Sequence, residues 1–182
     1  MLLIFGGLPG TGKTTLARRV AQLRPVTYVR IDAIEHTLRE AGRLPEDLGA
    51  LGYEVGAALA RSNLALGLPV LVDSVNPLPV TRQLWRSVAQ SLNLPFLEVE
   101  IVCSDAQEHA RRIATRSSDL PGLALPSWDE IQHRSYIPWS DAQLHIDTTH
   151  TAVDTGARVI IQRWRALTPR LQDSGHYYDL ES

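Results

Sequence analysis

The segment Gly7–Thr14 (GLPGTGKT) constrains this chain most, because it matches the pattern G-x-x-x-x-G-K-[ST] at every fixed position. The apolar run of residues 1–5 precedes it and is typical of a buried strand, while residues 15–23 follow with helical spacing. A strand, a glycine-rich turn and a helix in this order form the context in which the pattern binds phosphate. We therefore predict that the chain binds a nucleoside triphosphate.

The chemistry of the pattern assigns a role to each part of the loop. Glycines let the backbone curl so that successive N–H groups point at phosphate oxygens, and the helix start adds the positive end of its dipole. Lys13 can reach the β- and γ-phosphates, and the hydroxyl of Thr14 can hold Mg²⁺. The expected cofactors are therefore ATP and Mg²⁺. The expected nucleotide-binding residues of this region are Gly7, Leu8, Pro9, Gly10, Thr11, Gly12, Lys13, Thr14 and Thr15.

Strand-like apolar runs alternate with helical stretches along the chain. The expected strands are residues 1–5, 26–31, 70–72, 96–102 and 144–147, and the expected helices are residues 15–23, 33–41, 45–66, 79–92, 105–116 and 153–167. Strands separated by helices predict an α/β fold with a parallel sheet covered on both faces. The fourth strand alternates apolar and acidic residues, which favours a position nearer an edge of the sheet.

Length and composition limit the possible classes of protein. The 182 residues suit one domain, which we place at residues 1–167 and which is followed by a polar tail at 168–182. A net charge of −2 gives no general electrostatic reason to bind nucleic acid or a membrane, although it is compatible with a local basic patch. No apolar stretch reaches the roughly 20 residues that span a bilayer. The only cysteine, Cys103, is expected to be a buried thiol, which is consistent with the cytoplasm. The sequence does not indicate an oligomeric state.

Carboxylates follow three of the expected strands, where ligands of open parallel sheets bind. Asp32 follows the second strand and is a candidate base for the hydroxyl of an acceptor. The alternative is that Asp32 caps the next helix, in which case Glu35 would complete a capping pair. Asp73 follows the third strand and is expected to hold Mg²⁺ through water or to contact the substrate, the alternative being a turn residue. Asp147 follows the fifth strand and is interpreted as loop structure near the nucleotide base.

Residues 112–135 have the pattern of a closing lid. The helix expected at 105–116 is basic towards its end, where Arg112 and Arg116 are four residues apart and share one face. A flexible link follows, and Ser127 to Glu130 then predict the start of another helix with a capping box. Closure would bring arginines to the transferring phosphoryl group and exclude water. The alternative is that the arginines only stabilise a helix C-terminus.

This chain resembles a known family in its phosphate loop, in Asp32 and Asp73, and in the arginine pair Arg112/Arg116. Over residues 1–165 it resembles the small P-loop kinases, in particular the group of zeta-toxin-like kinases, chloramphenicol phosphotransferase, adenylylsulfate kinase and polynucleotide kinases, with an AAA-type ATP-binding domain. The resemblance implies a single-domain P-loop NTPase fold, a three-layer sandwich with a five-stranded sheet of order 2-3-1-4-5 and a helical lid. It also implies that Asp32 activates the acceptor hydroxyl, and that Arg112 and Arg116 contact phosphates or flank the adenine.

The expected function is an ATP-dependent kinase that transfers the γ-phosphoryl group of ATP to a hydroxyl of a small molecule. Lys13, Asp32 and Arg116 are the expected catalytic residues, and Thr14 and Asp73 the expected metal ligands. One alternative is a polynucleotide 5′-hydroxyl kinase, which needs a basic groove for the strand. Another is an NTP-dependent regulatory or toxin-like protein that acts on a macromolecule. The sequence does not identify the acceptor.

Overall fold

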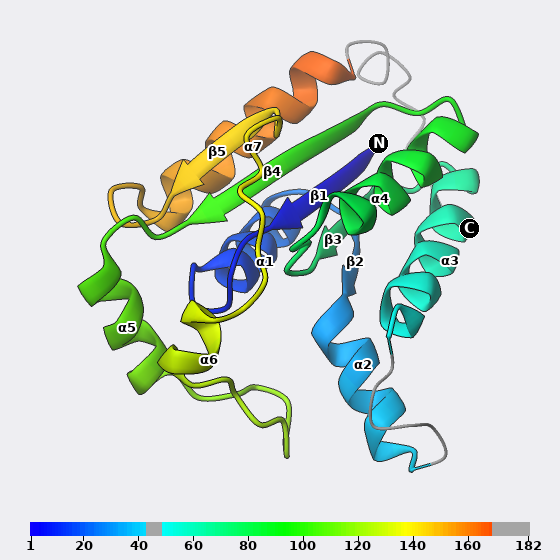
Figure 1. The fold of residues 1–182 in the computed structure, drawn as a ribbon. Coiled ribbons are helices and arrows are strands. Elements are labelled where there is room, and N and C mark those ends of the chain that lie inside the picture. The colour runs from blue at the N-terminus through cyan, green and yellow to red at the C-terminus, as the bar shows by residue number, and fades with distance from the viewer. Residues whose placement is uncertain (43–48, 169–182) are drawn as a thin grey trace, which may run out of the picture.

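A five-stranded parallel sheet forms the centre of the molecule, in a computed structural model that describes residues 1–42 and 49–168 (Figure 1). Its strands have the order β2-β3-β1-β4-β5, which confirms the predicted order. Because all strands are parallel, their carboxyl ends all lie at the same end of the sheet. The loop that follows β1 lies at this end. The strands are β1 (Leu2–Gly6), β2 (Thr27–Arg30), β3 (Val70–Asp73), β4 (Phe96–Val102) and β5 (Leu144–Asp147).

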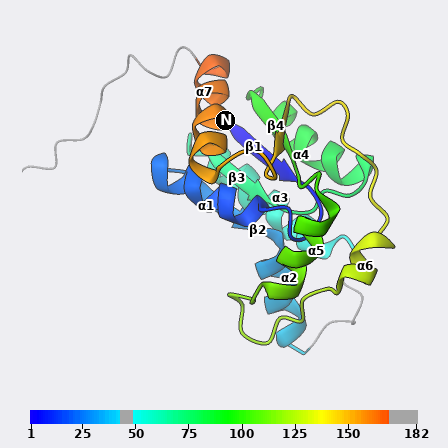
Figure 2. The ribbon, with the colours of Figure 1, turned by 90° about the vertical axis from the view of Figure 1, so that its left-hand side faces the viewer.

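Helices cover both faces of the sheet, as the expected three-layer sandwich requires (Figure 2). Successive side chains of β1 point to opposite faces, so that Leu3 and Phe5 pack under α1 and α7, while Leu2 and Ile4 pack under α3 and α4. All four of these side chains are fully buried, which explains why the first strand is a continuous apolar run. The covering helices are α1 (Lys13–Leu23), α3 (Leu51–Ala65), α4 (Pro79–Ser91) and α7 (Val153–Leu167).

Three further helices lie near the carboxyl ends of the strands. They are α2 (Ile31–Glu40), α5 (Ala106–Thr115) and α6 (Trp128–Gln132). Figure 1 shows α5 and α6 beyond the ends of β1 and β4, with α2 below β2. Ser127 and Glu130 form the predicted capping box of α6. Within the described ranges, no helix is long and apolar enough to cross a membrane.

The strand β4 lies between β1 and the edge strand β5, so it is nearer an edge than the central β1, as predicted, but is not itself an edge strand. Its acidic residues Glu98 and Glu100 are buried, and each has polar partners. Arg86 of α4 donates two hydrogen bonds to Glu98, at 2.5 and 2.8 Å. Glu100 accepts hydrogen bonds from the hydroxyl of Tyr136 at 2.7 Å and from the backbone N–H of Trp139 at 2.9 Å. The alternation thus marks buried, paired carboxylates rather than solvent exposure.

Several element bounds differ from those predicted. The helix α2 begins at Ile31 and therefore includes Asp32, and α5 ends at Thr115, one residue before Arg116. The predicted start of the third helix at residue 45 lies outside the described residues, as do residues 169–182 of the predicted tail. The last helix and the fifth strand have the predicted bounds.

We predict that Gly56→Val destabilises the fold, because α3 packs directly on apolar side chains of its neighbours at this glycine. A Cβ at Gly56 would lie 2.5 Å from Cδ1 of Ile31 and 3.1 Å from the ring of Trp85. Overpacking of this kind costs about 1–3 kcal/mol. Urea unfolding of Gly56→Val and of Ala58→Val, which adds bulk on the exposed side of the same helix, measures the effect. Equal losses of stability in the two variants would contradict the packing argument.

Candidate nucleotide-binding site

Positive φ angles at three glycines shape the loop between β1 and α1. Gly7, Gly10 and Gly12 have φ angles of 138°, 84° and 92°. A Cβ at Gly7 would lie 2.0 Å from the carbonyl oxygen of Ile101, so no other residue fits there without moving the backbone of β4. The N–H of Gly7 donates to the carbonyl oxygen of Val75 at 3.0 Å. The loop is thus held between β4 and the segment after β3, and it curls as the sequence pattern predicts.

Lys13 supplies the cation at the base of this loop. Its side chain is buried, and Nζ donates to the carbonyl oxygen of Leu8 at 2.9 Å, across the turn of the loop. Burial lowers the pKa of Lys13, and the negative charges of Asp73 and Asp32 oppose this shift. Arg116 adds to the lowering. Lys13, both predicted functional carboxylates and the predicted lid arginine therefore lie within electrostatic reach of one another.

The helix α5 supports the loop from the side. The Nε2 atom of His109 lies 2.8 Å from the carbonyl oxygen of Pro9, and a proton on Nε2 completes a hydrogen bond between them. A Cβ at Gly10 would lie 2.4 Å from Cδ1 of Ile113, so α5 packs directly on the loop backbone. The ring of Trp128, from α6, meets the ring of His109 edge-on at 5.0 Å. Contacts therefore run from α6 through α5 to the phosphate loop.

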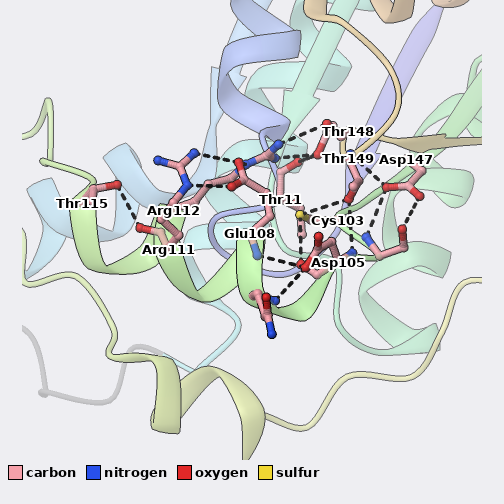
Figure 3. A network of polar contacts seen from close by, with 12 residues as sticks. Thr11, Cys103, Asp105, Glu108, Arg111, Arg112, Thr115, Asp147, Thr148 and Thr149 are labelled. Atoms are coloured by element: carbon pink, nitrogen blue, oxygen red, sulfur yellow. Dashed lines mark hydrogen bonds and ion pairs between the residues drawn. The ribbon is translucent and has the colours of Figure 1, made fainter.

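A polar network around Arg112 joins α5, the end of β5 and the loop (Figure 3). Arg112 donates to the hydroxyl of Thr148 at 2.7 Å, to its carbonyl oxygen at 3.1 Å and to Glu108 at 2.8 Å. The Thr148 hydroxyl donates to the carbonyl oxygen of Thr11 at 2.8 Å. Arg112 is thus fixed by three partners, so it lines the site as a positioned cation rather than a free one.

The polar partners of Asp147 and Cys103 are neighbouring residues of the same region. Asp147 accepts hydrogen bonds from the N–H of Ser104 at 3.1 Å and from the N–H of Thr149 at 3.0 Å (Figure 3). These bonds agree with the interpretation of Asp147 as loop structure. Cys103 is a buried free thiol, as expected, and its Sγ lies 3.4 Å from the hydroxyl of Thr149.

The two candidate carboxylates after β2 and β3 occupy different environments. Asp73 is buried at the end of β3 and accepts a hydrogen bond from the hydroxyl of Tyr28 at 2.7 Å. Asp32 is half-buried in the first turn of α2 and lines the cavity described below. The alternative prediction that Asp32 caps this helix is wrong, because Arg30 occupies the N-cap position and no side chain caps the helix. Glu35 therefore forms no capping pair with Asp32.

One cavity of about 770 Å³ brings the predicted residues together. Lys13, Thr14, Asp32, Arg112 and Arg116 all line it, whereas Asp73 does not. The Nε and Nη2 atoms of Arg116 are buried and, within residues 1–42 and 49–168, have no hydrogen-bond partner. Burial lowers the pKa of this guanidinium, and Asp32 opposes the shift. Arg116 thus lines the cavity with a largely buried guanidinium group.

Sequence reasoning missed other charged residues of this cavity, which are Arg18, Arg30, Glu35, Arg39, Asp119 and Arg134. Burial raises the pKa of Glu35, whose side chain packs against Gly52 of α3. Arg39 partly opposes that shift as its ion-pair partner one helical turn away. Apart from Glu35 and Arg39, which share α2, these residues come from different parts of the chain, so their association depends on the tertiary fold. Only the position of Arg30 at a strand end could have signalled a role.

Residues 116–127, here called the crossing segment, join α5 to α6 and reach across to α2. Arg30 donates through Nη1 to both carboxylate oxygens of Asp119, at 2.9 and 2.8 Å, and Arg18 also pairs with Asp119. Nε2 of His36 lies 2.8 Å from the carbonyl oxygen of Pro121. Figure 1 shows this segment extending from α5 toward α2. It therefore covers one side of the cavity, where the sequence predicted a lid.

The expected metal ligands fit Mg²⁺ better than other metals. The Thr14 hydroxyl and the Asp73 carboxylate are oxygen donors, and Mg²⁺ takes one or two such ligands together with substrate phosphates. No group of three or more His, Cys, Asp or Glu residues able to hold a metal ion occurs in the described part of the chain. An ion bound mainly through nucleotide phosphates is consistent with that arrangement.

Comparisons with known proteins agree with this fold. An uncharacterized protein of Mycobacterium tuberculosis is 31% identical over 129 residues, which are 64% of this chain and 26% of that protein. This chain therefore spans about a quarter of the length of that relative. The structure of the M. tuberculosis APS kinase CysC in complex with AMPPNP and APS matches with a TM-score of 0.69 at 20% identity, over 90% of this chain and 96% of that one. A gluconokinase from Sinorhizobium meliloti 1021 matches with a TM-score of 0.60 at 18% identity, over 89% and 91% of the two chains.

The sheet order and the glycine-rich loop between β1 and α1 define a P-loop NTPase with the fold of the small kinases. Within that class, the chain belongs to the AAA domain family, whose pattern matches residues 2–125.

We predict that the Asp119 carboxyl titrates far below its ordinary pKa of 3.8. Hydrogen bonds from Arg30 lower its pKa to about 2, although partial burial opposes the shift. A lowered pKa means that the contact with Arg30 stabilises the structure fully above about pH 4 and is lost as the pH falls towards 2. NMR titration of the Asp119 side-chain carbon measures this, and the variant Arg30→Gln should return the pKa towards 3.8. A midpoint near 3.8 in the unsubstituted protein would contradict the pairing.

Proposed function

We propose that the protein is an ATP-dependent phosphotransferase that moves the γ-phosphoryl group of ATP to a hydroxyl of a small molecule. One observation carries the proposal: Lys13, Asp32 and Arg116 line a single cavity beside the phosphate loop. These are a phosphate-binding cation, a carboxylate and a second cation, which are the groups that phosphoryl transfer requires.

Each group would act at a different point of the reaction. The loop N–H groups and Lys13 would bind the β- and γ-phosphates. Thr14 and Asp73 would hold Mg²⁺, which supplies further positive charge next to the phosphates. Asp32 would accept the proton of the acceptor hydroxyl as its oxygen bonds to phosphorus and the bond to ADP breaks. Arg116 would stabilise the charge that develops on the transferring group.

The covered cavity favours a small acceptor. Contacts from Asp119 to Arg30 and from Pro121 to His36 place the crossing segment over one side of the cavity. We propose that residues 112–135 act as a lid of the 1–167 domain and exclude water during transfer. The M. tuberculosis APS kinase was solved with the small molecule APS, which supports an acceptor of that size for a shared fold. ATP and Mg²⁺ as substrates, together with one buried free thiol, suit a cytoplasmic enzyme.

We predict that Lys13→Ala lowers phosphoryl transfer by at least about a hundredfold, because it removes the buried cation next to the γ-phosphate. The test incubates γ-labelled ATP and Mg²⁺ with fractionated small metabolites and, separately, with 5′-hydroxyl oligonucleotides. Arg19→Ala is the matched control, since Arg19 lies on the same helix but pairs with Asp154 outside the cavity.

Label in a small-molecule fraction supports the proposal and delivers the acceptor for identification. Label only in oligonucleotides would replace it with a polynucleotide kinase. Label in neither, with ATP still bound, would favour a protein that acts on another macromolecule. Transfer by Lys13→Ala at the unsubstituted rate would remove the loop from the mechanism.

We predict that Asp32→Asn retains ATP binding and loses about 10²–10⁴-fold in transfer rate, the range for loss of a general base. Calorimetry with AMPPNP measures binding, and single-turnover transfer measures the chemical step. Glu40→Gln is the control, because Glu40 is an exposed acid of the same helix outside the cavity. Weakened nucleotide binding with normal transfer would place Asp32 on the nucleotide rather than on the acceptor.

A further inference from the structure

We propose that the acceptor carries an acidic group, and that Arg30, assisted by Arg18, binds this group where the carboxylate of Asp119 lies in the present structure. The inference rests on the proposed phosphotransfer function and names the chemical class of its acceptor. That class is a small hydroxyl compound with a carboxylate, sulfate or phosphate group.

Arg30 has the surroundings of an anion-binding residue. Its side chain is only 13% exposed, and a single guanidinium nitrogen donates to both oxygens of Asp119. Its Nε is buried and has no hydrogen-bond partner among the residues that the structure describes. A planar guanidinium offers five donors in a fixed fork that matches two oxygens of one anion. Asp119 therefore engages a single nitrogen of this donor set.

The position of the arginine pair places it on the acceptor side of the cavity. Arg30 ends β2, opposite Asp73 of β3, and precedes the candidate base Asp32 by two residues. Arg18 lies one helical turn beyond Thr14 on α1. The network of Arg112 and Thr148 occupies a different wall, formed by α5 and the end of β5. An anion on Arg30 would thus sit next to the group proposed to activate the acceptor hydroxyl.

The balance of charge in the cavity also favours an anionic acceptor. Cationic side chains on the cavity wall outnumber carboxylates, and Arg39 is already paired with Glu35. If Lys13, Arg112 and Arg116 serve the nucleotide, Arg18, Arg30 and Arg134 remain, and Asp119 is the shared counter-ion of Arg18 and Arg30. Replacing the carboxylate of Asp119 by an acidic group of the acceptor would preserve this balance.

Asp119 is suited to being displaced. It lies in the crossing segment, outside any helix or strand, and its side chain is 43% exposed. Because the Asp119 side of this ion pair is open to solvent, an external anion can reach Arg30 and compete with the carboxylate. The carboxylate would therefore occupy the anion site in the free protein and leave it when the acceptor binds.

The test titrates sulfate into the full chain after AMPPNP and Mg²⁺ have saturated the phosphate loop, so that sulfate cannot bind there. Calorimetry gives the affinity, and the Nε–H NMR signal of Arg30 reports the place of binding. We expect Asp119→Asn to bind sulfate roughly tenfold or more tightly than the unsubstituted protein, because the internal competitor is removed.

Two double variants locate the site. Adding Arg30→Gln to Asp119→Asn should abolish saturable sulfate binding, whereas adding Arg39→Gln, which changes a neighbouring arginine of the same cavity, should leave it unchanged. The inference is overturned if Asp119→Asn shows no saturable binding, or if the variant with Arg30→Gln binds sulfate equally well; in either case Asp119 would only hold the crossing segment in place. Failure of AMPPNP to bind would instead contradict the proposed function.

A second measurement examines the acceptor itself. A metabolite extract is separated on an anion exchanger at neutral pH, and both fractions are offered to the protein with γ-labelled ATP. We expect label in the retained, acidic fraction. Label only in the flow-through would overturn the inference while supporting the kinase proposal. If neither fraction is labelled, the kinase proposal falls, and the sulfate titration still decides whether Arg30 binds an anion.

Discussion

The close approach of the loop after β1 to the backbone of β4 is the constraint on which the rest of the site depends. At Gly7 there is no space even for a Cβ beside the carbonyl oxygen of Ile101. This approach fixes where the chain turns into α1, and thereby where Lys13 enters the cavity. His109 and Ile113 pack on the same turn from α5. The phosphate loop is consequently packed between β4 and α5, with its other side on the cavity.

Local chemical patterns made most of the fold predictable. Continuous apolar runs marked buried strands, and their alternation with helical stretches indicated the parallel sheet, because each pattern reflects only near neighbours in the chain. The strand β4 shows the limit of this reasoning. The sequence did not indicate how its glutamates are paired, because Arg86 and Tyr136, which pair with them, are contributed by other parts of the chain.

The same distinction applies to the candidate site: some of its residues could be located from the sequence, and others could not. The phosphate loop could be located from sequence because its residues are contiguous, and Asp32 because it follows a strand. Arg30 and Asp119 are 89 residues apart, and their pairing depends on how the crossing segment returns to the sheet. Charged residues that meet only through the tertiary fold leave no spacing in the sequence by which they could be recognised.

The contact of α5 with both the phosphate loop and the crossing segment has a thermodynamic consequence. His109 bonds to Pro9 of the loop, Trp128 rests on His109, and Arg116 continues from the same helix into the cavity. If filling the loop shifts α5, it alters the free energy of ligands held by Arg116 and the crossing segment. Linkage makes such an effect reciprocal: each substrate would change the affinity for the other by the same factor. Cooperativity between the two substrates would then require no element beyond this single helix.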